Sequence, residues 1–422
     1  MSRSDYRRYM PTPETAKARG ETARQHAANM AKIPLIQNIL AGWQEMFNEP
    51  FKGLTTDGTI IPNLFKLAPE SAPVEPAIIA ANHLLSELSE EQKTAAVFDL
   101  HSKQWRNWQN TEIYLEDYGL RLAEVSDTVR EAILEIMRAS LSASGFDKTR
   151  GVMKLNGFLG ELVKSPAILG EFSYLFNLFG TPSSSEPWGW QIFGHHLALN
   201  CVFIGGQMTV TPTFMGGEPC MADTGPLTGL SIFDDEERLG LELMRSFSAD
   251  QQAQASMANS MVGGDLPEGR RIHHDGLHLG GAYCDNRIVP YEGLRGDDFS
   301  KLQRRNLLDL IEEYLGTLPA GPLAARMSDV ERHFAETHFC WIGPRELDSA
   351  FYYRIQSPVT LIEFDHHAGV FLTNPTPMNF HVHTLVRTPN GNDFGVDLIR
   401  QHYENAPHHK KHPGGHHFHG EE

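Results

Sequence analysis

The sequence predicts an α+β fold in which helices pack around a central antiparallel β-sheet, with a helical N-terminal third. Helical periodicity dominates the first third of the 422 residues, whereas aromatic and β-branched runs of strand length dominate the last third. The strands also lack the regular strand–helix–strand alternation that is typical of a parallel sheet. Because 41% of the residues are hydrophobic, the chain can bury a large core.

The N-terminal part, residues 1–180, is expected to be mainly helical. A weakly amphipathic pattern over 12–48 predicts the first helical region, and a proline-rich stretch over 62–76 indicates an extended connector. Two further helices are expected over 126–143 and 148–164.

Two pairs of residues mark helix starts. Ser89 and Gln92 have the spacing of a capping box, and so do Ser248 and Gln251. In this motif the serine and the glutamine each accept a hydrogen bond from the other residue's backbone N–H. Both pairs therefore predict local structure and carry no functional information.

The second part, residues 188–404, is expected to hold the sheet. Strands are predicted over 191–203, 207–214, 338–342, 350–355, 359–366 and 380–387, and Gly205–Gly206 predicts a tight turn between the first two. Helices are predicted over 234–261, 298–315, 321–337 and 393–403. We expect residues 1–404 to form a single domain and residues 405–422 to form a flexible histidine-rich tail.

The excess of acidic over basic residues disfavours some classes of binding partner. The chain carries 36 basic and 53 acidic residues, a formal charge of −17, which repels nucleic-acid backbones and anionic membranes. The four cysteines show no C-x-x-C spacing, and no stretch resembles a signal peptide or a membrane span. These features predict a cytoplasmic protein that acts on a small molecule rather than on nucleic acid or membrane.

The segment around His381 and His383 predicts metal ligands. Alternate side chains on a strand share a face about 6.5–7 Å apart, so two imidazoles in a His-x-His pattern can reach one ion. The same pattern also occurs as surface decoration.

A second histidine pair, His195–His196, follows Gly194 inside an apolar run. Burying imidazole is costly unless a partner satisfies it. If the segment is a strand, the two rings point to opposite faces, so one of them can join the site of His381 and His383. The competing interpretation is a pair of hydrogen-bonded core histidines.

Glu363 is a lone carboxylate in the apolar run Val359–Phe364. A buried acid needs a partner, and either a metal ion or Arg354 of the preceding predicted strand can serve. With Glu363, the ligand set becomes two or three imidazoles and one carboxylate, which suits iron, zinc, copper or manganese.

Other conspicuous residues are expected to have structural roles. His366–His367 and the group His273, His274 and His278 lie in segments that suggest exposed loops rather than ligands. Trp105 and Trp108 either cover a pocket or, as we favour, anchor a loop. The sequence contains no Walker loop, G-x-S-x-G or H-E-x-x-H pattern.

The order of these motifs resembles the bacterial family catalogued as domain of unknown function 3500. The resemblance rests on Trp188-Gly-Trp190, Gly194-His-His-Leu-Ala-Leu-Asn200, Thr211-Pro-Thr-Phe-Met-Gly216, Phe339-Cys-Trp-Ile-Gly343, Tyr352-Tyr-Arg354, Ile362-Glu-Phe364, His381-Val-His383, Arg387 and Asn392-Asp-Phe-Gly395. It implies one continuous domain with helices around a central antiparallel sheet. The family name assigns no reaction.

The functional hypothesis is a metal-dependent enzyme, an iron- or copper-dependent oxidoreductase acting on a small organic substrate. The alternatives are a metal-dependent hydrolase, for which zinc is the expected metal, and a protein that binds a metal or ligand without turnover. The expected metal ligands are His196, Glu363, His381 and His383, with His195 as an alternate ligand or a support.

Further residues are expected around this metal. Arg354 or Arg387 would orient an anionic substrate, and Asp393 would brace a ligand histidine. Trp188 and Trp190 would wall the pocket.

Overall fold

The computed structural model describes residues 3–18, 20–264, 266–267, 269–272 and 275–405. Its strands are β1 (Val97–Phe98), β2 (Leu120–Arg121), β3 (Tyr174–Phe179), β4 (Trp188–Gly194), β5 (Leu197–Ile204), β6 (Gln207–Gly217), β7 (Ser256–Ala258), β8 (Leu294–Arg295), β9 (His338–Ile342), β10 (Tyr352–Gln356), β11 (Leu361–His367) and β12 (Met378–Arg387). Its α-helices are α1 (Ala23–Met30), α2 (Pro34–Asn48), α3 (Val74–Glu87), α4 (Glu90–Ala96), α5 (Asp127–Ser140), α6 (Ala143–Leu162), α7 (Asp234–Ser246), α8 (Ala249–Ala255), α9 (Lys301–Leu315), α10 (Ala320–Arg332) and α11 (Val396–Asn405).

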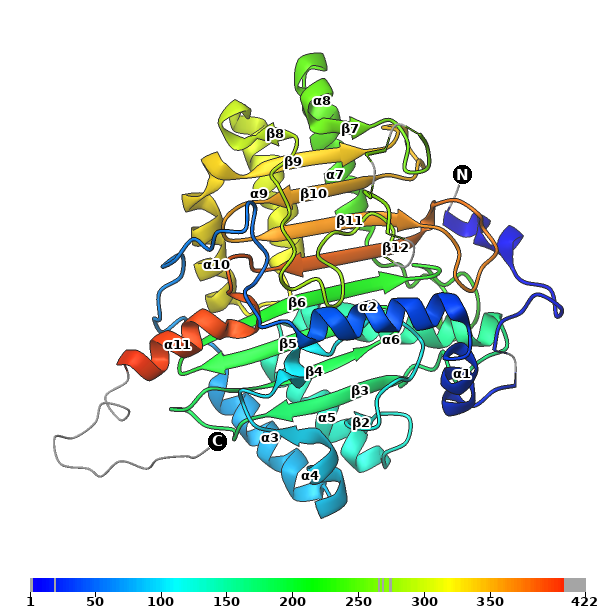
Figure 1. Cartoon of the computed structure of the whole chain (residues 1–422), viewed down its shortest axis with the longest axis vertical. Coiled ribbons are helices and arrows are strands. Elements are labelled where there is room, and N and C mark those ends of the chain that lie inside the picture. The colour runs from blue at the N-terminus through cyan, green and yellow to red at the C-terminus, as the bar shows by residue number, and fades with distance from the viewer. Residues whose placement is uncertain (1–2, 19, 265, 268, 273–274, 406–422) are drawn as a thin grey trace.

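One twisted sheet runs through the molecule (Figure 1). Its strand order is β1-β3-β4-β5-β6-β12-β11-β10-β9-β7, with β2 beside β3 and β8 beside β9. Among the described strands, only the pairs β1–β3 and β7–β9 near the two edges are parallel. The predicted α+β class is confirmed, and the sheet is mixed rather than purely antiparallel.

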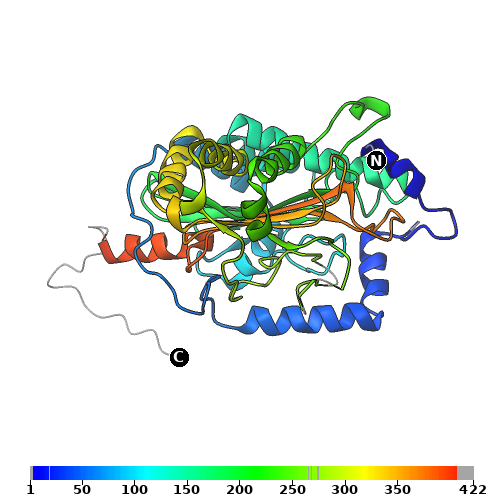
Figure 2. The ribbon, with the colours of Figure 1, turned by 90° about the horizontal axis from the view of Figure 1, so that it is seen from above.

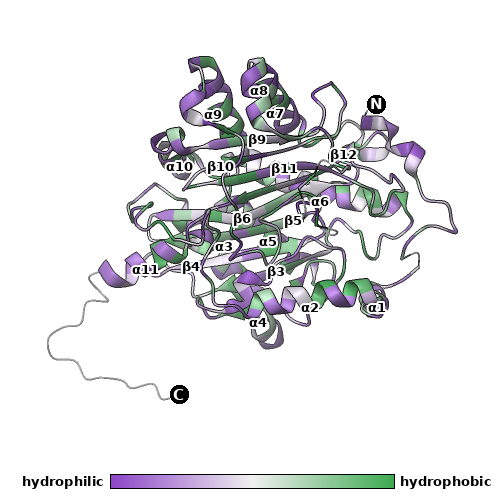
Figure 3. Cartoon of the chain, turned by 45° about the horizontal axis from the view of Figure 1, so that its top comes forward, coloured by the Kyte–Doolittle hydropathy of each residue, from purple (hydrophilic) through white to green (hydrophobic). Residues whose placement is uncertain are grey.

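The sheet is covered on both faces. Helices α6, α7, α9 and α10 lie on one face, and α2 lies across the other over a layer of long connections (Figure 2). Strands β4, β5 and β6 are consequently buried along almost their whole length, which explains their nearly continuous apolar sequences. Hydrophobic residues concentrate on the central strands, as Figure 3 shows.

Several predicted elements differ from those observed. The region 12–48 holds two helices, because Pro34 begins α2 at a position where its missing N–H costs nothing. The region 234–261 likewise holds two helices, α7 and α8, separated before Ser248. Strands β1, β2 and β3 lie within residues 1–180, so that part is less helical than expected. The capping boxes at the starts of α4 and α8 are both confirmed.

Helix α2 is fastened at its C-terminal end. Trp43 stacks on Tyr283 with ring centroids 5.0 Å apart. The guanidinium of Arg106 donates hydrogen bonds to the last carbonyls of the helix and of the residue that follows it, those of Met46, Phe47 and Glu49. Arg106 also pairs with Asp285 at 2.7 Å, which ties this helix end to the layer of connections.

No helix in the described part of the chain combines the length and the hydropathy needed to cross a bilayer. The residues expected to form a flexible tail lie, apart from Asn405 at the end of α11, outside the described residues.

Candidate metal centre

His195 and His196 form the whole turn between β4 and β5. Gly194 pairs with Leu197 across this two-residue hairpin, so the single strand predicted over 191–203 is wrong. His196 has a φ of 63°, in the left-handed region that costs a residue with a side chain about 1–3 kcal/mol. Such strain persists where the surrounding structure imposes it, and it clusters at functional sites.

The turn places His196 beside His381 and His383 of β12. These two histidines alternate along the strand and therefore share a face. The Nε2 atom of His381 lies 3.2 Å from that of His196 and 3.1 Å from that of His383. All three residues are buried, and each offers a ligand atom within 4.8 Å of the others. We call these three residues the histidine triad.

The spacing of the triad matches that of metal ligands. Nitrogen atoms about 2.0–2.1 Å from one tetrahedral ion are about 3.3–3.4 Å apart. Burial lowers the pKa of all three imidazoles well below 6.5, so they are neutral near pH 7 and hold lone pairs for an ion. A bound cation would interact with all three of these closely spaced imidazole nitrogen atoms.

Two carboxylates lie behind the triad. An oxygen of Glu218 is 3.8 Å from Nδ1 of His381, and one of Asp365 is 4.0 Å from Nδ1 of His383. Neither Nδ1 has a hydrogen-bond partner among the residues that the structure describes. Carboxylates in this position commonly orient metal-bound histidines, and a small shift would complete both hydrogen bonds.

His367 adds a fourth imidazole beside the triad. Its ring centroid lies 4.5 Å from that of His383 and 5.0 Å from that of His381. Its Nδ1 contacts the carbonyl oxygen of Ala368 at 2.9 Å, and its Nε2 is a buried acceptor that has no hydrogen-bond partner among the described residues. His367 therefore stands beside the triad as an unsatisfied imidazole and is not one of the three grouped ligands.

The expectation of exposed loop histidines is wrong at three positions. His367 is half-buried at the end of β11, His366 is buried in that strand, and His278 is buried with its Nε2 3.5 Å from Asp365. The glycines that follow suggested loops, but the first two positions belong to the strand that pairs with β12. His273 and His274, and the histidines after Asn405, lie outside the described residues.

His195 supports the triad rather than joining it. Its ring lies against that of His196, with centroids 3.8 Å apart and the planes tilted by 30°, so the two rings do not point to opposite faces as a strand would require. Its Nδ1 contacts the amide oxygen of Asn156 at 2.7 Å. Burial lowers the pKa of His195 to about 4, so the ring is neutral.

Glu363 does not meet the triad. Its carboxylate accepts hydrogen bonds from the backbone N–H groups of Leu279 and Gly280 at 2.8–2.9 Å and from the Tyr352 hydroxyl at 2.7 Å. Burial raises the pKa of Glu363, but nearby positive charge and these donors outweigh it, so the net shift is downward. The hydrogen bonds that compensate this buried carboxylate therefore come from the protein itself, and the carboxylate is not free to bind an ion.

The two arginines expected to orient a substrate form hydrogen bonds and ion pairs with other residues of the protein. Arg354 donates to the carbonyl oxygen of Pro290 and to Glu292 at 2.9 and 2.8 Å. Arg387 pairs with Asp393 at 2.7 Å and with Asp285 at 2.5 Å.

These arginines and Asp393 do not line the cavity beside the triad, which is described below. Asp393 accepts its hydrogen bonds from Arg387 and from the backbone of Thr388, so it braces no ligand histidine.

The tryptophans are packing residues. Trp188 stacks on Phe203, and Trp190 donates to the Ser140 hydroxyl at 3.0 Å, so neither walls the cavity. Trp105 stacks on Phe179 with centroids 3.8 Å apart, and Trp108 is fully buried. The anchoring interpretation of these last two fits the structure.

A cavity of about 960 Å³ lies beside the triad, between the sheet and α2. His196, His367 and His383 contribute to its lining. Much of the rest is apolar side chain from α2 and from the connections. This volume lies in the range of sites that enclose small organic ligands.

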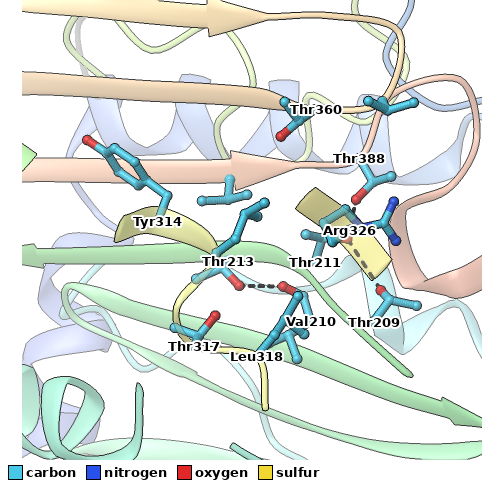
Figure 4. Close-up of a pocket in the computed structure, with 13 residues that line it drawn as sticks. Thr209, Val210, Thr211, Thr213, Tyr314, Thr317, Leu318, Arg326, Thr360 and Thr388 are labelled. Carbon is cyan, nitrogen blue, oxygen red and sulfur yellow. Dashed lines mark hydrogen bonds between the residues drawn. The ribbon is translucent and has the colours of Figure 1, made fainter. Parts of the chain in front are cut away.

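The opposite face of the sheet offers less room. A cavity of about 20 Å³ lies beneath α9 and α10, and several threonines contribute to its lining (Figure 4). The hydroxyls of Thr211 and Thr388 form a hydrogen bond of 2.8 Å, and the hydroxyl of Thr213 donates to the carbonyl oxygen of Val210. This cavity has room for about one water molecule. A neighbouring cavity of about 340 Å³ contains Lys148, whose ammonium is paired with Glu236 and Glu313.

His26 links α1 to the wall of the large cavity, and this link is expected to depend on pH. Its Nδ1 lies 3.1 Å from Glu21 and its Nε2 3.3 Å from Glu112. Burial opposes protonation, but the two carboxylates outweigh it and raise the pKa of His26 above 6.5. The stabilisation is thus fully present below about pH 6.5 and is lost as the pH rises through the raised pKa.

We therefore expect the melting temperature of the wild type to exceed that of His26→Gln by more at about pH 5.5 than at about pH 8.5. Thermal melts of both proteins across this range measure the difference. Glu112→Gln should weaken the trend, because it removes one of the two carboxylates that favour the protonated ring. An equal difference at all pH values would contradict the assignment.

Comparison with known proteins identifies the family. The model of the family described as "Protein of unknown function (DUF3500)" matches residues 70–396, so the chain belongs to this family. The match contains the histidine triad and every strand of the sheet. Searches of curated proteins and of solved structures gave no match.

Proposed function

We propose that this member of the DUF3500 family is a metal-dependent enzyme in which His196, His381 and His383 hold one divalent transition-metal ion. The observation that supports this most strongly is the convergence of three neutral imidazoles, at the spacing of metal ligands, beside a large cavity. Three protein ligands leave a coordination position open, as catalysis requires. The strained backbone of His196 is a further sign of a functional constraint.

The reaction that we favour is oxidation of a small organic substrate at a copper or iron centre. Imidazole ligands suit both metals, and the apolar lining of the cavity suits an organic molecule and dioxygen. Copper is preferred, because Glu363, the carboxylate that an iron site of two histidines and one acid would need, is bonded elsewhere.

A zinc-dependent hydrolase is the second candidate, and the neutrality of the triad supports it. Without a carboxylate ligand, the ion keeps its full charge and acidifies a bound water more strongly. A zinc ion held by the three histidines would lower the pKa of such a water to about 7 and would supply a nucleophile near neutral pH.

Elemental analysis tests the metal site. The full chain, purified without a nickel resin, should carry about one ion of copper, iron or zinc per triad after anaerobic loading and removal of weakly bound metal. The double variant His381→Gln, His383→Gln should lose this ion, because two of three ligands are gone. The histidine-rich C-terminal segment is present in both proteins, so the difference reports the triad alone.

Glu363→Gln is the matched control. Because its carboxylate faces backbone donors and not the triad, this variant should retain the ion. Equal metal content in the wild type and the folded double variant, checked by circular dichroism, would overturn the proposal. Copper or iron would direct the next assay to oxygen consumption, and zinc would direct it to hydrolysis.

A further inference from the structure

We infer that the large cavity binds an amphipathic carboxylate, with the apolar body of the ligand along α2 and its carboxylate at Arg271 beside the metal centre. This inference rests on the proposed function, since it names the substrate class of the same site. Three features support it: an apolar stripe that lines the cavity, an arginine without a partner among the described residues, and acids that are already paired.

The apolar stripe belongs to α2. Ile36, Ile39, Leu40 and Trp43 recur at helical spacing and all line the cavity. Among them only Trp43 is buried. Ile36, Ile39 and Leu40 are half-buried, and although Ile39 and Leu40 also pack against the core, all of them keep apolar surface in the lining of the cavity. Leu35, at the edge of the stripe, remains 45% exposed. A ligand with an apolar body would cover this surface and gain about 25 cal/mol for each Å² removed from water.

Arg271 supplies a positive charge at the cavity. It lines the cavity, is exposed, and makes no hydrogen bond or ion pair with any residue that the structure describes. Arg271 lines the same cavity as the triad residues His196 and His383, so the guanidinium and the metal centre share one space. A guanidinium with free donors binds a carboxylate through two parallel hydrogen bonds.

The other charges of the lining favour an anion over a cation. The carboxylates of Glu21 and Glu112 share His26 between them, so neither is free for a ligand. Asp365 accepts a hydrogen bond from the backbone N–H of Leu277 and lies 3.5 Å from Nε2 of His278, so it too has partners within the protein. A divalent ion on the neutral triad would add further positive potential beside Arg271.

Size sets the range of ligands. The cavity of about 960 Å³ is at the upper end of the range for small-molecule sites, which suits a carboxylate with a chain or ring system of ten or more carbons. Its carboxylate at Arg271 would hold the adjoining carbons near the open position of the metal.

Binding of three probes with the same chain tests the inference. Dodecanoate, dodecanol and dodecyltrimethylammonium are titrated into the zinc-loaded full chain below their micellar concentrations, and calorimetry, together with the total tryptophan fluorescence to which Trp43 of the cavity contributes, reports binding. We expect dodecanoate to bind at least about 10-fold more tightly than the other two. Arg271→Gln should remove this preference, whereas Arg305→Gln, at an exposed arginine of α9, should not.

The apolar contribution is tested separately. Leu40→Asn should weaken binding of dodecanoate and dodecanol alike, since both place the same chain on α2. Equal affinity for the three probes, or a dodecanoate affinity that Arg271→Gln leaves unchanged, would overturn the inference. Arg271 is exposed, so its substitution is expected to preserve the fold.

Repeating the titrations on metal-free protein separates this inference from the proposed function. If the triad binds no metal but dodecanoate still depends on Arg271, the ligand class stands and the metal-dependent enzyme fails. If the triad binds metal and the probes do not differ, the ligand class fails alone.

Discussion

Replacing Arg387 with methionine is expected to lower the free energy of unfolding by about 3–5 kcal/mol. The guanidinium is fully buried on β12 and pairs with Asp393 and Asp285, while donating to the carbonyl oxygen of Gly280 at 2.9 Å. Methionine fills much of the same volume but leaves two carboxylates buried with less compensation. Chemical unfolding followed by tryptophan fluorescence measures the loss.

Two comparisons make this test specific. Arg238→Met removes ion pairs from an arginine whose side chain is 52% exposed, where solvent and salt limit the cost to less than about 1 kcal/mol. Adding Asp393→Asn to Arg387→Met should recover part of the loss, because it removes one of the uncompensated charges. Normal stability together with lost turnover would instead favour the catalytic role expected of Arg387 from the sequence.

Replacing Gly216 with alanine is expected to weaken metal binding by about 10–100-fold, the range seen when residues that support metal ligands are changed. A Cβ atom here would lie 3.0 Å from the Cδ2 atoms of both His196 and His383 and 2.8 Å from the carbonyl oxygen of Val382. The backbone oxygen cannot move without distorting the pairing of β6 with β12. The two rings must therefore separate.

Metal affinity measured by competition with a chelator tests this expectation. Gly42→Ala on α2 is the control, because its Cβ would meet no atom within 4 Å. That change should leave metal affinity unaltered and should raise stability by about 0.5–1 kcal/mol, the usual gain of alanine over glycine within a helix. Unaltered affinity in a folded Gly216→Ala protein would exclude a metal held between these rings.

The sequence was most informative where local pattern determines structure. Capping boxes and the His381-x-His383 alternation depend on neighbouring residues, and both features occur as expected. The turn at His195–His196 escaped prediction, because two-residue hairpins usually carry glycine or asparagine where a positive φ is needed. Strand β3 was not predicted either, because a short apolar run of this kind is also typical of a buried helical segment.

The partners of buried charges could not be predicted in the same way. Glu363 and Asp365 alternate on β11 and are both fully buried, yet only Asp365 lies near a triad histidine. A connection distant in sequence presents the N–H groups of Leu279 and Gly280 to Glu363 and that of Leu277 to Asp365. Such contacts depend on how long loops fold over the sheet, and no local pattern specifies that.

The fastening of α2 by Arg106 and Trp43 at its C-terminal end has a kinetic consequence. The triad is built on the sheet, whose central strands are buried, whereas the cavity beside it is roofed by a helix of which only Trp43 is buried. Tilting of α2 about its anchored end would open a path for a ligand and would break no strand pairing. Release of the ion, in contrast, would require loss of its bonds to three side chains that the sheet holds in place. A molecule could thus enter and leave many times during the residence of a single metal ion.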